Sequence, residues 1–533
     1  MKKYVIGIDF GTLSARAVLF DLKTGEEAAE AVYTYPHGVM DFGRPKYALQ
    51  HPDDYLEALK TTIAGLAADP AEVAALGIDF TCCTMVAVDE KLEPLCKRFE
   101  NPHAYVKLWK HHGAVEQADR FDAFAKKEEW FRIFGGSSSS EWLFPKIMET
   151  LDEAPEVFDA TYRFMEVADW LSWRMTGRET HNASMAGLKN HWSKEYGYPD
   201  NEFLKKVHPG LGGIVGTKVS AVVNSVDETA GVLNECGAAM TGLLPGTPVA
   251  LPMVDAHAPL AALNIVGEGE MLVVIGTSTC HIINTKHPAT VPGITAYVQD
   301  GMIPGFYTYE SGQAGAGDCF DWFVHHCVPA SYTAEAEERG MNIHALLREK
   351  AMRLKPGRNR LVALDWWSGN RSVLKNDNLT GMILGLTMQT KPEEIYRALI
   401  EATAYGTRRI IENYEEHGIP VTDICAAGGI ARKDPMLMQI YADVTGREFR
   451  VARTGQAAAR GSALYAAVAA GVCRDITEAA EKYARPDAER YTPDPGAAEI
   501  YEALYREYKK LHDYFGLENR VMERLDEIAG RAE

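Results

Sequence analysis

The sequence predicts an α/β fold that uses one strand–turn–strand unit twice. Short apolar strands alternate with helical patterns along the 533 residues, which is typical of a layered α/β protein. A Gly-Thr turn between two strands occurs near the N-terminus and again about 265 residues later. With 46% hydrophobic and 24% charged residues, the chain has the composition of a globular protein with a large core.

The first half begins with a β-meander. Apolar runs bounded by Gly, Thr and Ser turns predict strands over 4–10, 15–20 and 29–35. Apolar residues on one helical face then predict a helix over 52–67. A strand over 73–80 follows, with polar residues 81–84 at its carboxyl end.

The pattern restarts near residue 267. A strand over 270–275, a turn over 276–279 and a return strand over 280–284 repeat the first unit. The periodicity predicts, in order, a helix over 392–417, a strand over 422–427, a helix over 435–445 and solvated helices in the last forty residues. We expect two domains, residues 1–265 and 266–533.

Charge and cysteine content restrict the partners and the cellular compartment that we expect for the protein. A net charge of −19 repels a polyphosphate backbone, so we expect no nucleic-acid partner. The nine cysteines include no C-x-x-C, and the adjacent Cys82 and Cys83 favour reduced thiols over a disulfide or a zinc knuckle. The long uncharged stretch 236–254 contains three prolines, which argues against a membrane span. These features predict a soluble, cytoplasmic protein.

The first Gly-Thr turn has the residues of a phosphate site. Gly11 is free to take a positive φ and to present backbone N–H groups, and Thr12 adds a hydroxyl donor. Asp9 is a candidate ligand for Mg²⁺ through water, and Arg16 is a candidate contact for the transferred phosphoryl group. A plain hairpin whose aspartate caps the turn explains the string equally well.

The second turn, Gly276-Thr277-Ser278-Thr279, shifts that balance towards function. Two donor-rich turns that face each other would hold a polyphosphate from both sides. Further along, Gly428 and Gly429 follow a strand and would let a flat ring or a ribose approach the backbone. An ordinary tight turn between strand and helix is the alternative for that pair.

Asp255 is the candidate catalytic base. It ends an apolar strand, where a carboxylate can accept the proton of an attacking hydroxyl. By itself, the position fits an N-cap of a helix over 256–265 better than a base. We expect the neighbouring His257 to be a packing residue.

Many strings along nearly the whole chain resemble the FGGY family of sugar kinases. They are IGIDFGT, YALQHPDDYLEAL, GIDFTCCTM, NPHAYVKLWKHHGA, AGLKNHWSKEYGYP, VDAHA, IGTSTCH, YESGQAGAGDCFDWF, DWWSGNRS, GGIARKDPMLMQIYADVTG and GSALYAAVAAG. The resemblance implies two ribonuclease-H-like domains of the actin/Hsp70 type flanking a deep cleft for nucleotide and sugar. It is closest to the ribulose-phosphorylating branch of the family.

The resemblance also implies roles for particular residues. Asp255 corresponds to the family's base, and the adenosine of ATP is expected near Gly428 and Gly429. The two phosphate motifs correspond to Asp9, Gly11 and Thr12, and to Gly276, Thr277 and Ser278. Sugar contacts are implied for Lys189, Glu310 and Asp255, with Cys82 bordering the sugar. Without the resemblance, a surface ion pair is the preferred interpretation of Lys189 and Glu310.

The implied activity is the ATP- and Mg²⁺-dependent phosphorylation of a ketopentose. L-Ribulose, converted to L-ribulose 5-phosphate in L-arabinose catabolism, is the expected substrate. Another pentulose or pentitol (D-ribulose, D-xylulose or ribitol) is the first alternative, and an actin/Hsp70-like ATPase that binds a protein or polymer is the second. The family also suggests a homodimer.

Four further positions carry expectations of their own. Cys82 is larger than the Gly or Ala that the family leads us to expect, which implies a tighter pocket. Arg460 stands where a small or apolar residue is expected near the nucleotide end. Trp109 fits either the sugar's C–H face or the core, and the run 110–112 is expected to be a solvated helix face.

Overall fold

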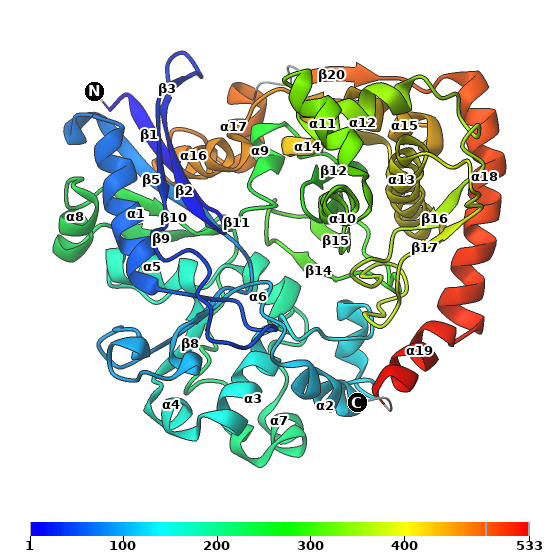
Figure 1. The fold of residues 1–533 in the computed structure, drawn as a ribbon. Coiled ribbons are helices and arrows are strands. Elements are labelled where there is room, and N and C mark those ends of the chain that lie inside the picture. Colours follow the sequence, from blue (N-terminus) through cyan, green and yellow to red (C-terminus); the bar gives the residue numbers. More distant parts are fainter. Residues whose placement is uncertain (1, 485–487, 531–533) are drawn as a thin grey trace.

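Two large sheets organise the protein in a computed structural model that describes residues 2–484 and 488–530 (Figure 1). The first has the strand order β3-β2-β1-β5-β10-β9, with β11 also pairing with β5. Its strands are β1 (Tyr4–Phe10), β2 (Ser14–Asp21), β3 (Glu27–Thr34), β5 (Val73–Phe80), β9 (Thr229–Val232), β10 (Pro248–Ala250) and β11 (Met253–Val254). As predicted, the first three strands form an antiparallel meander. The structure also pairs β5 with β1 in parallel.

The second sheet repeats this arrangement. Its order is β14-β15-β13-β12-β18-β19-β20, so that β15-β13-β12-β18 corresponds to β3-β2-β1-β5. Its strands are β12 (Glu270–Ile275), β13 (Thr279–Thr285), β14 (Ala296–Gln299), β15 (Tyr307–Gln313), β18 (Asp423–Ala427), β19 (Phe449–Ala452) and β20 (Ala488–Tyr491). The duplicated strand–turn–strand unit predicted from the sequence is therefore confirmed, because β12 pairs antiparallel with β13 and parallel with β18.

Helices cover both faces of the first sheet. Phe10 and Phe80 point to one face, where both rings pack on Tyr55 of α1 (Pro52–Gly65). Gly7 and Gly77 point to the other face, where α16 (Ala457–Ala469) crosses so closely that a Cβ on Gly7 would lie 1.9 Å from the carbonyl oxygen of Ala459. The strand's period of two thus separates the two helix contacts.

The helix α16 comes from the C-terminal half of the chain yet packs on the N-terminal sheet, together with α17 (Ile476–Tyr483) (Figure 1). Leu272, Ile282 and Cys425 of the second sheet belong to the same hydrophobic core as the first sheet. The two halves therefore share buried surface, and the expected domain boundary between residues 265 and 266 stays a prediction.

The remaining helices surround these sheets. In the first half they are α2 (Val115–Ala125), α3 (Leu143–Glu153), α4 (Pro155–Ala160), α5 (Val167–Thr176), α6 (Ala183–Lys189), α7 (Asn201–Val207), α8 (Glu235–Thr241) and α9 (Pro259–Ala262). In the second half they are α10 (Gly317–Cys327), α11 (Ala330–Glu338), α12 (Ile343–Met352), α13 (Pro392–Glu416), α14 (Gly429–Lys433), α15 (Pro435–Thr445), α18 (Pro495–Asp513) and α19 (Val521–Gly530). Two small sheets are formed by β4 (Leu49–Gln50), β6 (Met85–Val88), β7 (Val106–Lys107) and β8 (Arg163–Glu166), and by β16 (Val362–Leu364) and β17 (Met382–Leu384).

Two sequence expectations about helices are wrong. The helix expected over 256–265 is only the short α9. The last helices are not simply solvated, because Tyr501, Tyr505 and Tyr508 of α18 are buried against the second core. Within the described ranges, no helix has the length and apolar content needed to cross a bilayer.

Candidate active site

Three aspartates gather where strands of the first sheet end. Asp9 near the end of β1 lies beside Asp79 of β5 in the sheet register. Asp255 follows β11, and its backbone N–H donates to the carbonyl oxygen of Phe80 at 2.9 Å. Asp79 is fully buried and accepts a hydrogen bond of 2.6 Å from Oγ of Ser462 on α16. Parallel β1, β5 and β11 thus bring the three carboxyl groups to one edge.

Burial and mutual repulsion shift the titration of these groups. Burial raises the pKa of Asp9, and burial with the charge of Asp9 raises the pKa of Asp79. For Asp255, burial first and the charge of Asp9 second raise the pKa to about 7. A group of oxygens that disfavours its own charge is suited to a divalent cation, which neutralises it.

Sequence reasoning missed Asp79, although a signal was present. The string Gly-Ile-Asp-Phe occurs at 7–10 and again at 77–80, and the two copies pair residue for residue between β1 and β5. In both copies the glycine leaves room for the backbone of α16, and the aspartate two residues later lies on the same side of the strand.

Lys189, Glu310 and His257 form a second polar cluster, built from both halves of the chain. Nζ of Lys189, at the end of α6, lies 3.6 Å from Oε1 of Glu310 on β15. Nε2 of His257 lies 2.9 Å from Oε2 of Glu310. The lysine and glutamate side chains are only 13% and 5% exposed, so they are not the surface ion pair that the residues alone suggested.

The charges in this cluster are fixed by one another. Burial by itself raises the pKa of Glu310, but Lys189, His257 and Arg371 outweigh it and lower the pKa to about 2. The carboxylate in turn holds the pKa of Lys189 well above its ordinary value, although burial opposes this. His257 is therefore a polar partner of Glu310 rather than a packing residue, and that expectation is wrong.

Asp255 connects the two clusters. Asp9, Lys189 and Glu310 all act electrostatically on its carboxyl group. Its Oδ1 accepts from the N–H of Ala256 at 2.7 Å, whereas α9 begins at Pro259 with Ala258 as its N-cap. Asp255 is therefore not the cap of that helix, and its carboxyl group interacts electrostatically with residues of both clusters.

The first Gly-Thr turn lies beside the aspartates. The N–H of Gly11 donates to the carbonyl oxygen of Ser14 at 3.0 Å, and Nε1 of Trp109 donates to Oγ1 of Thr12 at 3.0 Å. Gly11 does not adopt the positive φ expected of it; instead, a Cβ there would lie 3.3 Å from the Ser14 oxygen. Arg16 is exposed and lies opposite Asp9 in the register of β1 and β2.

The second Gly-Thr turn adjoins the start of α10 and the diglycine. The N–H of Gly317 donates to the carbonyl oxygen of Gly276 at 3.0 Å, and that of Ala316 to Thr277 at 2.9 Å. Gly428 has a φ of 100°, and a Cβ there would lie 2.3 Å from the carbonyl oxygen of Ile275. At Gly429 a Cβ would meet nothing within 4 Å. The backbone at Gly429 is therefore open to a ligand.

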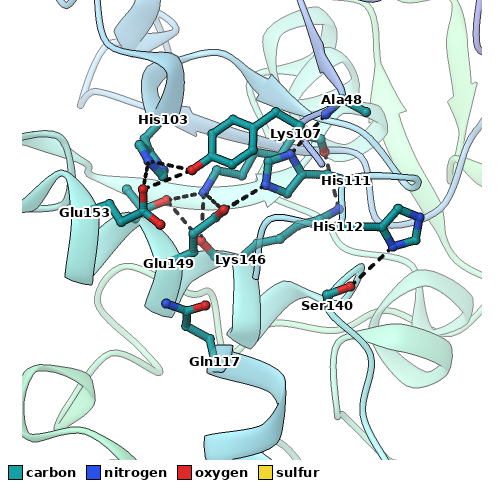
Figure 2. A network of polar contacts seen from close by, with 12 residues as sticks. Ala48, His103, Lys107, His111, His112, Gln117, Ser140, Lys146, Glu149 and Glu153 are labelled. Atoms are coloured by element: carbon teal, nitrogen blue, oxygen red, sulfur yellow. Dashed lines mark hydrogen bonds and ion pairs between the residues drawn. The ribbon is translucent and has the colours of Figure 1, made fainter. Parts of the chain in front are cut away.

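A network of polar contacts, most of it buried, surrounds Glu149 (Figure 2). Nζ of Lys107 donates to Glu149 at 2.5 Å, and Nε2 of His111 lies 2.9 Å from the same carboxylate. Lys146 donates to the carbonyl oxygens of Cys83 and Leu108, both at 2.6 Å. The run 110–112 is therefore not a solvated helix face: His111 is fully buried, and the network fixes the segment that carries Trp109.

Cys82 and Arg460 differ from one another in their relation to the site. Cys82 is 4% exposed, and Lys189 acts on its thiol; the contact with Cys83 and burial raise its pKa well above the ordinary value. Arg460 lies on α16, where its Nη2 donates to the carbonyl oxygens of Gly25 at 3.0 Å and Tyr483 at 2.8 Å. It anchors α16 to the turn between β2 and β3 and to the end of α17, and neither bond involves Gly428 or Gly429.

Both halves of the chain match models of one protein family. Residues 4–261 match the N-terminal domain, and residues 271–470 the C-terminal domain, of the FGGY family of carbohydrate kinases. A protein named ribulokinase from Bacillus licheniformis is 47% identical over 97% of both chains. One of the same name from Mycolicibacterium smegmatis is 43% identical over all of this chain and 97% of its own.

Solved structures share the fold at low identity. A gluconate kinase from Lactobacillus acidophilus superposes with a TM-score of 0.81 at 18% identity, covering 97% of this chain and 99% of its own. A xylulose kinase from Rhodospirillum rubrum gives 0.80 at 22% identity, covering 96% and 99%. The predicted actin/Hsp70-type pair of domains is therefore confirmed.

Proposed function

Because the chain belongs to the FGGY family of carbohydrate kinases, we propose that it transfers the γ-phosphoryl group of ATP to the terminal hydroxyl of L-ribulose. The products are L-ribulose 5-phosphate and ADP. Relatives named ribulokinase, 43–47% identical over nearly full chains, support this choice of sugar. The observation that carries the proposal is that the buried carboxyl group of Asp255 interacts electrostatically with the Lys189–Glu310 ion pair.

Asp255 serves as the general base. Its carboxylate accepts the proton of the hydroxyl as that oxygen attacks the γ-phosphorus, and the bond from phosphorus to the β-phosphate oxygen breaks. A pKa of about 7 suits this task, since the group is a stronger base than an ordinary aspartate and is still largely ionised above neutral pH.

Lys189, Glu310 and Cys82 select the sugar. The ammonium donates to hydroxyl oxygens, and the carboxylate accepts from hydroxyl protons. His257 keeps one oxygen of Glu310 in place at 2.9 Å. A sugar that lacks a matching hydroxyl leaves one of these buried groups without a partner, at a cost of about 1–3 kcal/mol.

The two Gly-Thr turns bind the phosphates. Gly11, Thr12 and Arg16 approach from the first sheet, and Gly276, Thr277 and Ser278 from the second. The adenosine binds at the diglycine, where Gly428 makes the tight turn against Ile275 and the backbone at Gly429 is open to the ligand. Donors fixed before the reaction stabilise the charge that develops on the transferred group.

Asp9 is the proposed ligand of Mg²⁺. Three crowded carboxyl groups whose pKa values are all raised fit a hard divalent cation, which prefers oxygen ligands and keeps several waters. When bound, the ion would offset the negative charge of the phosphates. Asp255 is assigned the role of base rather than metal ligand, and Lys189 and Glu310 act electrostatically on its carboxyl group.

An ADP-release assay over L-ribulose, D-ribulose, D-xylulose and ribitol tests the proposal. We expect the highest kcat/KM with L-ribulose and release that requires both ATP and Mg²⁺. A higher kcat/KM with another pentulose or pentitol would replace the substrate while keeping the kinase. ATP hydrolysis that no sugar stimulates, but that a protein or polymer does, would favour the actin-like alternative.

A further inference from the structure

Two adjacent thiols and a carboxylate meet beside the proposed sugar site. Sγ of Cys82, Sγ of Cys83 and a carboxylate oxygen of Glu166 all lie within 4.8 Å of one another. The three residues are 4%, 2% and 3% exposed. The proposed phosphoryl transfer uses Cys82 only as a wall of the pocket and does not use Cys83 or Glu166.

The backbone explains why neighbouring thiols share one side. In an extended strand, successive side chains point to opposite faces. Cys83 instead has a φ of 61° in the turn three residues after the end of β5, which breaks the alternation and lets the two sulfur atoms approach each other. A left-handed cysteine is uncommon, so other contacts must hold this turn.

Several hydrogen bonds hold the turn at Cys83. Glu166 accepts from the N–H groups of Cys83 at 3.2 Å and Thr84 at 3.0 Å. Lys146 of the buried network in Figure 2 donates to the carbonyl oxygen of Cys83 at 2.6 Å. The side-chain amide of Asn190 donates to Glu166 at 3.0 Å, and its Oδ1 has no hydrogen-bond partner within the described part of the chain. The turn is thus fixed with both thiols on the side of the carboxylate.

This donor set has the chemistry of a site for a thiophilic cation. Zn²⁺ binds thiolate sulfur at about 2.3 Å and carboxylate oxygen at about 2.0–2.2 Å, usually with four ligands. Three ligand atoms within 4.8 Å of one another need to close by about an ångström to surround one ion. The fourth position would be taken by water. Hard ions such as Mg²⁺ prefer oxygen ligands and are not expected here.

We propose that Cys82, Cys83 and Glu166 form a binding site for a thiophilic divalent cation such as Zn²⁺, and that its occupancy weakens sugar binding. Two S–H bonds break as two sulfur–metal bonds form, and both protons leave to solvent. With the glutamate ionised, the occupied site carries one net negative charge. No oxidation takes place.

The link to the sugar site runs through Lys189 and Asn190. Lys189 is an electrostatic neighbour of both thiols and lies 3.6 Å from Glu310. Two thiolates formed beside it compete with Glu310 for the ammonium group. The next residue, Asn190, is bonded to Glu166 and would move with that ligand. This second half of the inference rests on the proposed function, since it assumes that Lys189 binds the sugar.

The site is tested by metal titration of the full chain without nucleotide, in a buffer with a phosphine reductant. Co²⁺ and Cd²⁺ serve as spectroscopic probes, because thiolate coordination gives a sulfur-to-metal charge-transfer absorption, and Zn²⁺ is then used to displace them. We expect binding of one ion per chain with release of protons. Cys83→Ser, Cys82→Ala and Glu166→Gln should each weaken it at least about tenfold.

Cys473→Ser is the matched control, since Cys473 is buried to the same 4% but lies away from this cluster. It should bind the probes as the unmodified protein does. Thermal unfolding of each variant shows whether it has folded, and three independent substitutions keep the test valid if one of them does not fold. No charge-transfer band, or a band unaffected by all three substitutions, would overturn the site.

The coupling is tested by repeating the titration with saturating L-ribulose. We expect the sugar to weaken metal binding, and Zn²⁺ to raise the Kd of the sugar by the same factor, because linkage is reciprocal. A normal band with identical affinities in the presence and absence of bound sugar would overturn the coupling. If L-ribulose does not bind at all, the proposed substrate fails, while the band still reports on the metal site.

Discussion

At the scale of single residues, the site depends on what surrounds each carboxyl group. Glu310 is flanked by Lys189 and His257, so its pKa falls to about 2. Asp255 is buried and lies near Asp9, so its pKa rises to about 7. In the proposed reaction the two acids have different tasks, Glu310 as a permanent anion that holds the sugar and Asp255 as a base that exchanges a proton.

This difference predicts the pH dependence of the free enzyme. A base must be deprotonated to act, so kcat/KM for the sugar should rise with pH, reach half its maximum near pH 7 and level off above about pH 8. At pH 6 we expect about a tenth of the plateau value. Initial rates at fixed ionic strength, with MgATP and sugar both well below saturation, report on the free enzyme and measure the profile.

Asp9→Asn supplies the control for the origin of that pKa. Removing the neighbouring charge should move the limb of the profile to lower pH, even though the overall rate also falls. A limb at the same pH in Asp9→Asn would show that the charge of Asp9 does not act on Asp255.

At the scale of elements, the aspartate edge depends on the close approach of α16 to β1 and β5. Gly7 and Gly77 leave room for the helix backbone, and Ser462 on the same helix donates to Asp79. The position of the carboxyl groups therefore depends on the docking of a helix that is more than 370 residues away in sequence.

Gly77→Ala should disrupt this feature. Its Cβ would lie 2.1 Å from the carbonyl oxygen of Ser462, so α16 must shift. We expect a loss of about 1–3 kcal/mol in the free energy of unfolding, as for other overpacked cores, together with reduced kcat. Urea denaturation and kinetics measure the two effects.

Gly496→Ala is the matched control, since its Cβ would lie 3.4 Å from Oδ1 of Asp494 in the first turn of α18. This substitution should be neutral or slightly stabilising. Equal stability of the Gly77 and Gly496 variants would contradict the close-packing account.

The sequence predicts these elements unevenly. Strands such as 4–10, 73–80 and 270–275 agree with the structure to the residue, because their apolar runs are bounded by clear turn residues. The short α9, the buried His111 and the Glu310 partner of His257 could not be read from local pattern, because each depends on contacts between distant segments. The docking of α16 on the first sheet was missed for the same reason. The repeated Gly-Ile-Asp-Phe string nevertheless indicates that the two strands have similar surroundings.

At the scale of the whole molecule, the two halves meet on two sides of the proposed site. On one side α16 and α17 return to the first sheet. On the other, Nζ of Lys375 donates to the carbonyl oxygens of Phe134 at 2.8 Å and Ser137 at 2.6 Å, and Arg371 lies 3.4 Å from Glu141. These contacts join the halves near the proposed sugar residues, since Arg371 also acts electrostatically on Glu310.

Lys375→Met should therefore affect sugar binding from a distance. It leaves two carbonyl oxygens without their charged donor, a loss of about 1.5–3 kcal/mol in the arrangement that brings the halves together. We expect the KM for the sugar to rise at least about tenfold, with a smaller change in kcat. Exposed Lys355→Met is the control. A lowered melting temperature with an unchanged KM would assign Lys375 a purely structural role.

The central claim is that Asp255 removes the proton from a sugar hydroxyl held by Lys189 and Glu310. Single-turnover phosphorylation of L-ribulose by Asp255→Asn, alongside calorimetric sugar binding, tests it most directly. The account predicts a rate lower by about 10²–10⁴-fold, a sugar Kd within a few-fold of the unmodified protein and a similar melting temperature. A rate near that of the unmodified protein would contradict it.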